Sequence, residues 1–227
     1  MVLSPAQSSG LALDFHIHTK HSGDSEADPE EMIQAAEDLG LFGLCVTEHA
    51  SFEASAWVEA LRDETPVKLF RGVEVYTVWS HIQLFGVDKD FWKDWKPAAE
   101  KNGRPYYDAR RICRETVQRG GVVVVPHPYM TGYTYLMGDR AEELDGVAAV
   151  ETRSGNPRIR PEDNLRADRL ADRLGVGHTG GSDAHCPKDV GKWVTHLPRP
   201  VRDEEDLVRL LQQGGYRAGR LKTCGEG

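Results

Sequence analysis

The sequence predicts one α/β domain whose strands close into a barrel. Short apolar segments typical of strands alternate with amphipathic segments typical of helices, which favours a mostly parallel sheet. The chain has 227 residues, enough for one substantial core, and it contains no linker, low-complexity block or repeat. About seven such β/α units favour a closed barrel over an open sheet, and such barrels carry functional sites at the carboxyl ends of their strands.

Capping residues define the first helix. Asp28 is suited to the N-cap and Pro29 to the first helical position. Glu30 and Glu31 place negative charge in the first turn, where the helix dipole favours it. Gly40 is typical of a helix end, so we expect the helix to lie between Asp28 and Gly40.

The remaining elements are assigned in the same way. Residues 122–125 are four consecutive valines, typical of a strand covered on both faces. Predicted strands cover residues 11–18, 42–47, 67–76, 81–87, 122–125, 147–151, 176–179 and 193–197. Predicted helices cover residues 28–39, 53–62, 104–119, 161–174 and 204–213. Residues 88–103 are expected to be irregular, and residues 1–10 to form a loose leader before the domain at 11–227.

The charge of the chain limits its partners. The formal net charge is −8, and there is no basic tract. Long nucleic acid is therefore not expected as a main partner, because binding along its backbone needs clustered Lys and Arg. A small anionic substrate is compatible with this charge if a metal ion supplies positive charge locally.

The sequence favours a cytoplasmic protein without a membrane partner. No apolar stretch reaches the length of a membrane span, and the N-terminus lacks a signal-peptide pattern. The cysteines show no C-x-x-C spacing, which argues against a zinc knuckle or a disulfide framework. Buried or idle thiols are expected at Cys45, Cys113, Cys186 and Cys224.

A His-x-His pair lies at the end of the first predicted strand. Side chains two residues apart on a strand point the same way, so His16 and His18 are expected to project together. Phe15 and Ile17 are expected to face the other side. Two imidazoles on one face of a strand end are suited to binding a transition metal.

Further histidines and isolated acids fall at, or close to, the ends of later strands. They are His49, Glu74, His81, His127, Asp183 and His185. In a barrel these strand ends meet at one rim, which would bring six of the nine histidines together. A mixture of His and carboxylate without Cys indicates a catalytic Zn, Mn or Fe site, and the number of ligands predicts two or three divalent ions.

These motifs resemble those of the PHP (polymerase and histidinol phosphatase) family. They run in the family's order over nearly the whole domain. The matching segments are Asp14-Phe15-His16-Ile17-His18-Thr19 with Ser22, Val46-Thr47-Glu48-His49, Gly72-Val73-Glu74, His81 in its apolar strand, Pro126-His127-Pro128 and Gly181-Ser182-Asp183-Ala184-His185. The resemblance implies a distorted (β/α)7 barrel that commonly holds three metal ions.

The resemblance also implies a ligand set. The first ion would use His16, His18, Glu74 and Asp183. The second would share Glu74 and add His81 and His127, and the third would use Asp24, His49 and His185, with Glu26 as the alternative to Asp24. The family usually has Asp where this chain has Glu48, so the supporting role of that position is open.

Other residues near the motifs have weaker signals. His21, His178 and His196 are expected to lie outside the site. Arg153, Arg158 and Lys20 are candidate phosphate contacts, because cations, and Arg above all, suit phosphate; a solvated charged loop is the alternative for Arg153 and Arg158. The loop with Tyr129, Tyr133 and Tyr135, interleaved with Met130 and Met137, would form either a pocket wall or a packed cover.

The expected activity is metal-dependent hydrolysis of a phosphomonoester or a small phosphodiester. A hydroxide bridging the ions would attack phosphorus, with Glu74 as the bridging ligand and Asp183 as proton acceptor. A small phosphorylated substrate is the expected partner, and the oligomeric state is open. The alternatives are a histidinol-phosphate phosphatase, a non-catalytic module that binds a partner, and hydrolysis at carbon.

Overall fold

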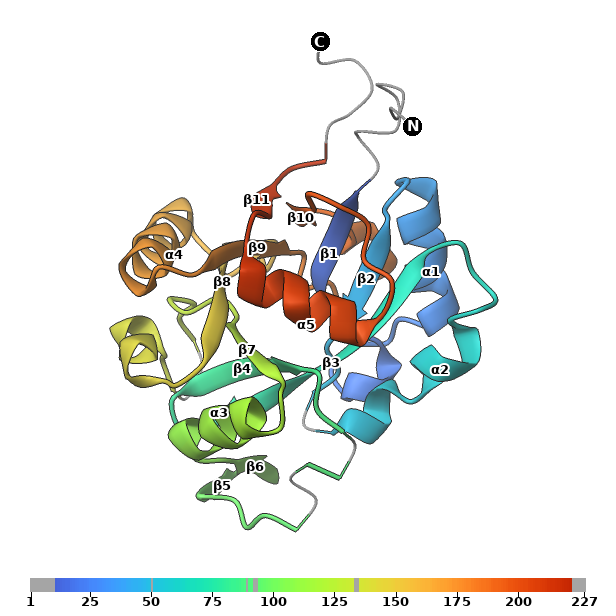
Figure 1. Cartoon of the computed structure of the whole chain (residues 1–227). Helices are drawn as coiled ribbons and strands as arrows, with labels where there is room; N and C mark the ends of the chain where they lie inside the picture. The colour runs from blue at the N-terminus through green and yellow to red at the C-terminus, as the bar shows by residue number, and fades with distance from the viewer. Residues whose placement is uncertain (1–10, 50, 89, 92–93, 133–134, 222–227) are drawn as a thin grey trace.

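The computed structural model describes residues 11–49, 51–88, 90–91, 94–132 and 135–221 (Figure 1). The expected leader at 1–10, together with Tyr133 and Cys224, lies outside the described residues. Among those described, no helix is both long and apolar enough to cross a membrane.

A nine-stranded sheet forms the centre of the molecule, with strand order β11-β10-β1-β2-β3-β4-β7-β8-β9. The strands are β1 (Ala12–Ile17), β2 (Gly43–Val46), β3 (Lys68–Thr77), β4 (Ser80–Phe85), β7 (Val122–Val125), β8 (Val147–Ser154), β9 (Gly177–Gly181), β10 (Val194–His196) and β11 (Arg217–Gly219). The pairs β1–β2, β2–β3, β7–β8 and β8–β9 are parallel. Every strand predicted from the sequence is therefore present.

The two ends of the parallel part of this sheet come together. Ile17 at the end of β1 forms a parallel bridge with Ala184, three residues after β9. The His18 N–H donates to the Ala184 carbonyl at 2.9 Å. The sheet therefore curls into a nearly closed barrel, which confirms the predicted fold class.

The barrel is distorted because β4 runs against its neighbours. It pairs in antiparallel fashion with both β3 and β7. Only Val78 and Trp79 separate β3 from β4, and so short a connection cannot make a parallel crossover. The two successive strands predicted here, at 67–76 and 81–87, are therefore present as an antiparallel hairpin within an otherwise mostly parallel barrel.

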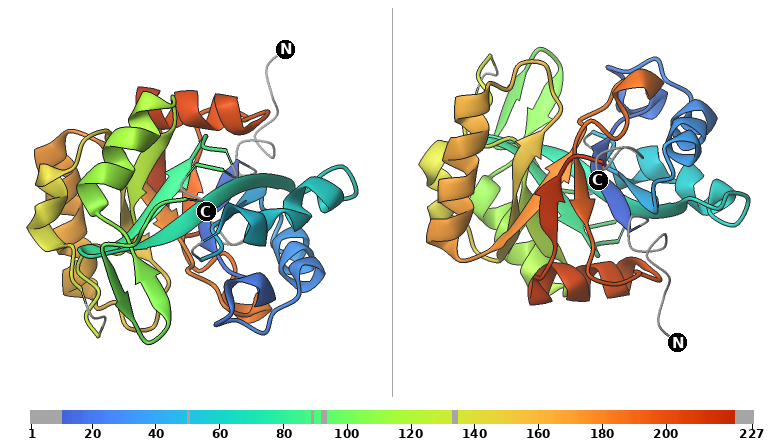
Figure 2. Two further views of the ribbon diagram at one scale, coloured as in Figure 1. Left: turned by 90° about the horizontal axis from the view of Figure 1, so that it is seen from below. Right: turned by 90° about the horizontal axis from the view of Figure 1, so that it is seen from above.

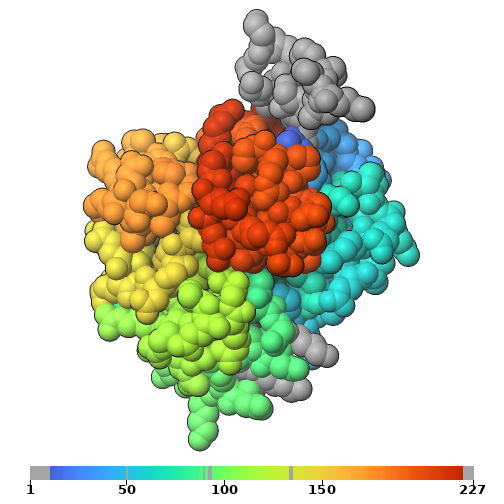
Figure 3. Space-filling model, viewed as in Figure 1, coloured from blue at the N-terminus to red at the C-terminus, as the bar shows by residue number. Residues whose placement is uncertain are grey.

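In the described part of the chain, five α-helices pack against the barrel. They are α1 (Pro29–Asp38), α2 (Trp57–Leu61), α3 (Ala109–Gln118), α4 (Pro161–Leu174) and α5 (Glu204–Gln213). The predicted helix at 53–62 is split, because residues 52–55 form a 3-10 turn before α2. Figure 3 shows α5 covering the centre of the face turned towards the viewer.

A small hairpin replaces the predicted start of the third helix. Strands β5 (Ala99–Lys101) and β6 (Arg104–Tyr106) pair around Asn102 and Gly103, which have φ angles of 53° and 72°. Two consecutive positive φ values are the signature of a tight hairpin turn, which Asn-Gly favours. The prediction of an irregular stretch over 88–103 is thus wrong only from Ala99 onwards, and the helix predicted from 104 begins only at Ala109. Figure 2 shows this hairpin and α5 at opposite ends of the barrel.

Side chains of the barrel strands pack either in an inner cluster, inside the barrel, or in an outer cluster, between the strands and the surrounding helices. Val122 and Val124 belong to the inner cluster with Leu207 of α5, whereas Val123 and Val125 pack in the outer cluster with Ile112 of α3. The valine strand is covered on both faces, as predicted. Because α5 and the inner apolar cluster fill one end of the barrel, the polar side chains gather at the other end.

Candidate metal centre

A β-bulge in β1 aims both histidines of the first motif into the barrel mouth. Asp14 pairs with Leu44 but Ile17 pairs with Val46, so β1 has one more residue than β2 across this stretch. Such an extra residue interrupts the alternation of faces. Phe15 therefore faces the inner core, whereas Ile17 packs in the cluster that contains α1, and the expectation that these two share a face is wrong.

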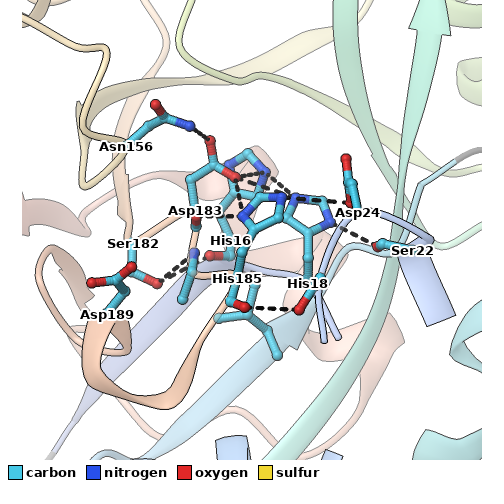
Figure 4. A network of polar contacts seen from close by, with 12 residues as sticks. His16, His18, Ser22, Asp24, Asn156, Ser182, Asp183, His185 and Asp189 are labelled. Atoms are coloured by element: carbon cyan, nitrogen blue, oxygen red, sulfur yellow. Dashed lines mark hydrogen bonds and ion pairs between the residues drawn. The ribbon is translucent and has the colours of Figure 1, made fainter. Parts of the chain in front are cut away.

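Two carboxylates lie beside His16 and His18. Their Nε2 atoms are 3.0 Å apart. The Glu74 Oε2 atom lies 3.4 Å from His16 Nε2 and 3.3 Å from His18 Nε2, and Asp183 Oδ1 lies at the same two distances. All four side chains are buried, and Figure 4 shows Asp183 beside the two imidazoles.

The second oxygen of Glu74 faces a different pair of imidazoles. Glu74 Oε1 lies 3.1 Å from His81 Nδ1 and 3.1 Å from His127 Nε2. His81 can take part because β4 is antiparallel, so its first residues lie at the same rim as the last residues of β3. One carboxylate therefore joins two groups of ligand atoms.

A third group lies on the outer side of His18. Asp24 Oδ2 is 3.1 Å from His49 Nε2, and Asp24 Oδ1 is 3.6 Å from His185 Nε2. The His18 ring lies against both imidazoles, with centroid distances of 4.3 Å to His49 and 4.6 Å to His185. Asp24, not the exposed Glu26, makes these contacts, and all nine predicted ligand residues thus gather in one cluster.

The spacing and chemistry of these atoms fit divalent metal ions. Ligand atoms bound at about 2.0–2.1 Å around one tetrahedral ion are about 3.3 Å apart. The separations of 3.0–3.4 Å among the His16, His18, Glu74 and Asp183 atoms match this spacing. Facing imidazole nitrogens and carboxylate oxygens are the donors of Zn, Mn and Fe sites.

Two of the predicted ligands adopt a backbone conformation that is unfavourable for side chains with a Cβ atom. Asp183 has a φ of 51° and His127 a φ of 27°. Such strain persists where the surroundings hold it, typically at functional sites. Gly181 permits the close approach beside Asp183, because a Cβ there would lie 2.5 Å from the His16 Cβ atom.

Glu151 at the carboxyl side of β8 contacts two of the predicted ligands. Its Oε1 lies 3.1 Å from His16 Nδ1, and its Oε2 accepts the His127 N–H at 2.9 Å. A carboxylate behind a ligating imidazole fixes the ring and its tautomer. This role was not predicted, although an acid at the end of a buried predicted strand was a usable signal.

Two further side chains support the cluster. Asn156 donates to Asp183 Oδ2 at 2.6 Å, as Figure 4 shows, and was not predicted to do so. Glu48 accepts the Thr19 N–H at 3.0 Å and the Ser22 hydroxyl, and the Ser22 Oγ atom lies 3.0 Å from His18 Nδ1. Glu48 therefore reaches His18 through Ser22, which gives this position a supporting role.

Charges within the cluster compensate one another. Burial alone would raise the pKa of Glu74, but the His81 and His16 imidazoles hold that pKa well below its usual range. Burial also lowers the pKa of His18, yet Asp183 and Glu74 outweigh this and raise that pKa to about 9. A positive charge is therefore strongly favoured between these carboxylates, whether a proton or a metal ion supplies it.

The candidate phosphate contacts have other partners. Arg153 places its Nη1 atom 2.8 Å from both carboxylate oxygens of Asp168 on α4, and Lys20 forms an ion pair with Asp28. Arg158 is exposed, and its backbone N–H donates to Asn156.

The remaining histidines lie outside the cluster. The His178 ring lies between Asp168 and Asp172, His196 contacts the Arg220 carbonyl, and His21 lies near Trp57. In the aromatic loop, Tyr129, Met130 and Met137 are buried as a packed cover, whereas Tyr135 lines a cavity beside His81.

The fold and the cluster define an α/β barrel with a candidate His/carboxylate metal centre at its rim. Comparison with protein families identifies the particular group. The PHP domain model matches residues 14–161, and the PHP-associated model matches residues 161–215. The chain therefore belongs to the PHP family.

Two curated relatives cover most of the chain. A "Probable phosphatase" of Vibrio parahaemolyticus is 28% identical over an alignment of 234 residues, and the match covers 94% of this chain and 89% of the relative. A "Probable phosphatase" of Aliivibrio fischeri is 27% identical over an alignment of 203 residues, and the match covers 80% of this chain and 81% of the relative.

Solved structures share the fold. PsfC from Pseudomonas syringae superposes with a TM-score of 0.65 at 22% identity, over 94% of this chain and 92% of that one. A lesion-specific endonuclease from Pyrococcus furiosus superposes with a TM-score of 0.65 at 18% identity, over 92% of this chain and 57% of that one. At these identities the likeness establishes the architecture alone.

Proposed function

We propose that the protein is a metal-dependent phosphoesterase that hydrolyses a phosphomonoester or a small phosphodiester. The observation that carries this proposal is the position of Glu74, whose two oxygens face two separate groups of ligand atoms. A carboxylate in this position is suited to bridging two divalent ions, and paired ions are typical of phosphoryl-transfer sites.

The cluster offers room for two or three ions of Zn, Mn or Fe. His16, His18, Glu74 and Asp183 would hold one, Glu74, His81 and His127 a second, and Asp24, His49 and His185 a third. When bound, such ions lower the pKa of a coordinated water and offset the charge that grows on the phosphoryl oxygens.

The side chains of the chain perform the remaining tasks. Glu74 fixes the separation of the two ligand groups, and Glu151 holds the His16 ring. Asp183 accepts the proton of the attacking water, and Asn156 keeps the Asp183 carboxylate oriented through its bond to Oδ2. The burial of these ligands keeps bulk water out of the ligand layer.

The comparisons favour a phosphate ester over other substrates. Two relatives are named "Probable phosphatase", and an endonuclease shares the fold. The net charge of −8 favours a small substrate over long nucleic acid. Histidinol phosphate is one substrate within this class. The non-catalytic alternative would be favoured by lost ligands, whereas here every predicted ligand position is present in the cluster.

Removal of the first histidine pair tests the proposal. The double variant His16→Ala/His18→Ala should lose at least one ion per chain by elemental analysis. Its turnover of 4-nitrophenyl phosphate and bis(4-nitrophenyl) phosphate should fall by about 100-fold or more, since even loss of a residue behind a ligand costs about 10–100-fold.

The matched control is His178→Ala, whose ring contacts Asp168 and Asp172 outside the cluster. It should keep its metal content and its turnover. Circular dichroism must show that both variants are folded. Undiminished turnover in the folded double variant would refute the proposal.

A further inference from the structure

A cavity of about 360 Å³ lies directly beside the candidate metal centre. His81, whose imidazole faces Glu74, forms part of its wall. The hairpin β5–β6 contributes Lys101, Arg104 and Tyr106, and the loop after β7 contributes Tyr135. Its volume lies in the range of small-molecule sites.

Two cations project from one face of the hairpin. Lys101 and Arg104 are a directly opposed pair on either side of the turn, so their side chains share a face. Glu100 pairs with Pro105 on the other face, so its carboxylate does not neutralise them. Within the described part of the chain, neither Lys101 nor Arg104 has an ion-pair partner. Two uncompensated cations in a chain of net charge −8 indicate an anion site.

Backbone bonds and ring contacts fix the hairpin against the metal centre. The Tyr107 N–H donates to the Tyr76 carbonyl, and the Val78 N–H donates to the Tyr107 carbonyl, both at 2.9 Å. The Arg104 guanidinium lies 5.2 Å from the centre of the Tyr76 ring. The hairpin is thus anchored at the end of β3, close to the ligands.

The Tyr76 ring itself packs on two of the predicted ligands. Its centroid lies 4.7 Å from that of His49 and 4.9 Å from that of His81. Arg104 is therefore separated from two ligating imidazoles by a single aromatic ring. An anion bound by Arg104 would lie within one small molecule's length of the metal centre.

Aromatic rings form the rest of the wall. The Tyr106 and Tyr135 rings are 5.1 Å apart and nearly perpendicular, at 69°. Such faces suit a planar or ring-shaped group lying between the metal centre and the cations.

We propose that this cavity binds the leaving group of the substrate, and that Lys101 and Arg104 select leaving groups that carry a second anionic group, a carboxylate or a phosphate. The proposal rests on the proposed function, in which the scissile phosphoryl group lies at the metal centre. Arginine and lysine recognise both anions through charge-assisted hydrogen bonds. Lys101 and Arg104 are specificity-determining residues in this arrangement and take no part in bond cleavage.

A matched aryl series tests this selection. Phosphate release is measured for phenyl phosphate, 4-carboxyphenyl phosphate and 1,4-phenylene bisphosphate with the metal-loaded protein and with Lys101→Ala/Arg104→Ala. The double variant should lose roughly 10- to 100-fold in kcat/KM for at least one of the two anionic substrates, because hydrogen bonds to charged groups are lost. Its kcat/KM for phenyl phosphate should stay within about twofold, because only transition-state binding of the second anion is removed.

The control variant is Lys68→Ala, which removes an exposed cation at the start of β3, far from the hairpin. Its kcat/KM values for all three substrates should equal those of the wild type. The anionic substrate whose kcat/KM falls more in Lys101→Ala/Arg104→Ala carries the preferred anion. An equal fall in kcat/KM for all three substrates, or no fall for either anionic substrate, would overturn the proposal.

Binding of uncleavable analogues separates this proposal from the proposed function. Calorimetry compares phenylphosphonate with 4-carboxyphenylphosphonate and 1,4-phenylenediphosphonate on the metal-loaded protein. Tighter binding of a doubly anionic analogue, abolished in the double variant, supports the anion site even if no ester is hydrolysed, and then only the proposed activity fails. Equal affinities of the wild type for all three, or an affinity gap that survives in the variant, refute the anion site.

Discussion

At the scale of single residues, the cluster depends on carboxylates that each serve two partners. Glu74 divides its oxygens between two groups of imidazoles, and Glu151 holds His16 with one oxygen and the His127 backbone with the other. The gathering of most candidate ligands could be predicted because strand ends of a barrel converge on one rim, whereas Asp24 followed only from the family resemblance. Glu151 and Asn156 could not, because their roles depend on side-chain geometry that spacing along the chain does not determine.

The role of Glu151 leads to a quantitative expectation. Glu151→Gln keeps the shape but puts an amide behind His16, so the ring is held less firmly and is less basic. Metal affinity should fall by about 10–100-fold, measured by titration with a competing chelator. The exposed Glu100→Gln is the control and should bind as the wild type does. Unchanged affinity in Glu151→Gln would show that the carboxylate does not position the ligand.

At the scale of elements, two short turns explain where the structure departs from a regular barrel of alternating strands and helices. Asn102-Gly103 forms a hairpin that the helical expectation from residue 104 overlooked. The two-residue connection at Val78 and Trp79 makes β4 antiparallel. Both departures lie on the side of the barrel that forms the cavity, so the elements that differ from a regular barrel are those next to the site.

The true start of α3 can be tested through its cap. The Asp108 carboxylate accepts the Arg111 N–H at 2.6 Å. Asp108→Ala should lower the free energy of unfolding by about 1 kcal/mol, measured by denaturant titration. Asp108→Ser retains a capping oxygen and should lose less. Equal losses in the two variants would mean that capping is not the cause.

At the scale of the whole molecule, the barrel keeps its apolar core and its charged cluster at opposite ends. The inner apolar cluster and α5 fill one end, and the charged cluster occupies the other. Figures 1 and 2 show α5 lying across the first of these ends. The alternation of strands and helices was enough to predict a barrel with the site at the carboxyl ends of its strands, but not that α5 fills the other end. The bulge in β1 was not predictable, because it depends on pairing with β2.

The charged end should make the stability of the metal-free protein depend on pH. The pKa of His18 is raised to about 9 from 6.5, so the folded state binds this proton more tightly than the unfolded state. Its stabilising contribution is complete below pH 6.5 and is lost as the pH rises through 9. Burial raises the pKa of Asp14 to about 6, so that group has largely finished titrating below this window.

Thermal unfolding across this window provides the measurement. The Tm of chelator-treated protein should fall between pH 6.5 and 9, whereas metal-loaded protein should keep its Tm, because the metal replaces the proton on the imidazole. His18→Gln should reduce this fall in the metal-free protein, and the raised pKa values of His16 and His127 should account for what remains of it. A metal-free wild type whose Tm does not fall in this window would contradict the raised pKa.

The bridge between Ile17 and Ala184 also has a consequence during translation. His16 and His18 leave the ribosome early, but they meet Asp183 and His185 only after β9 has been made and has joined β1. Contacts so distant along the chain form late in folding. If the cluster binds ions as proposed, loading of the complete centre belongs to the last stage of the protein's synthesis, when nearly the whole domain is already available to shield the ions.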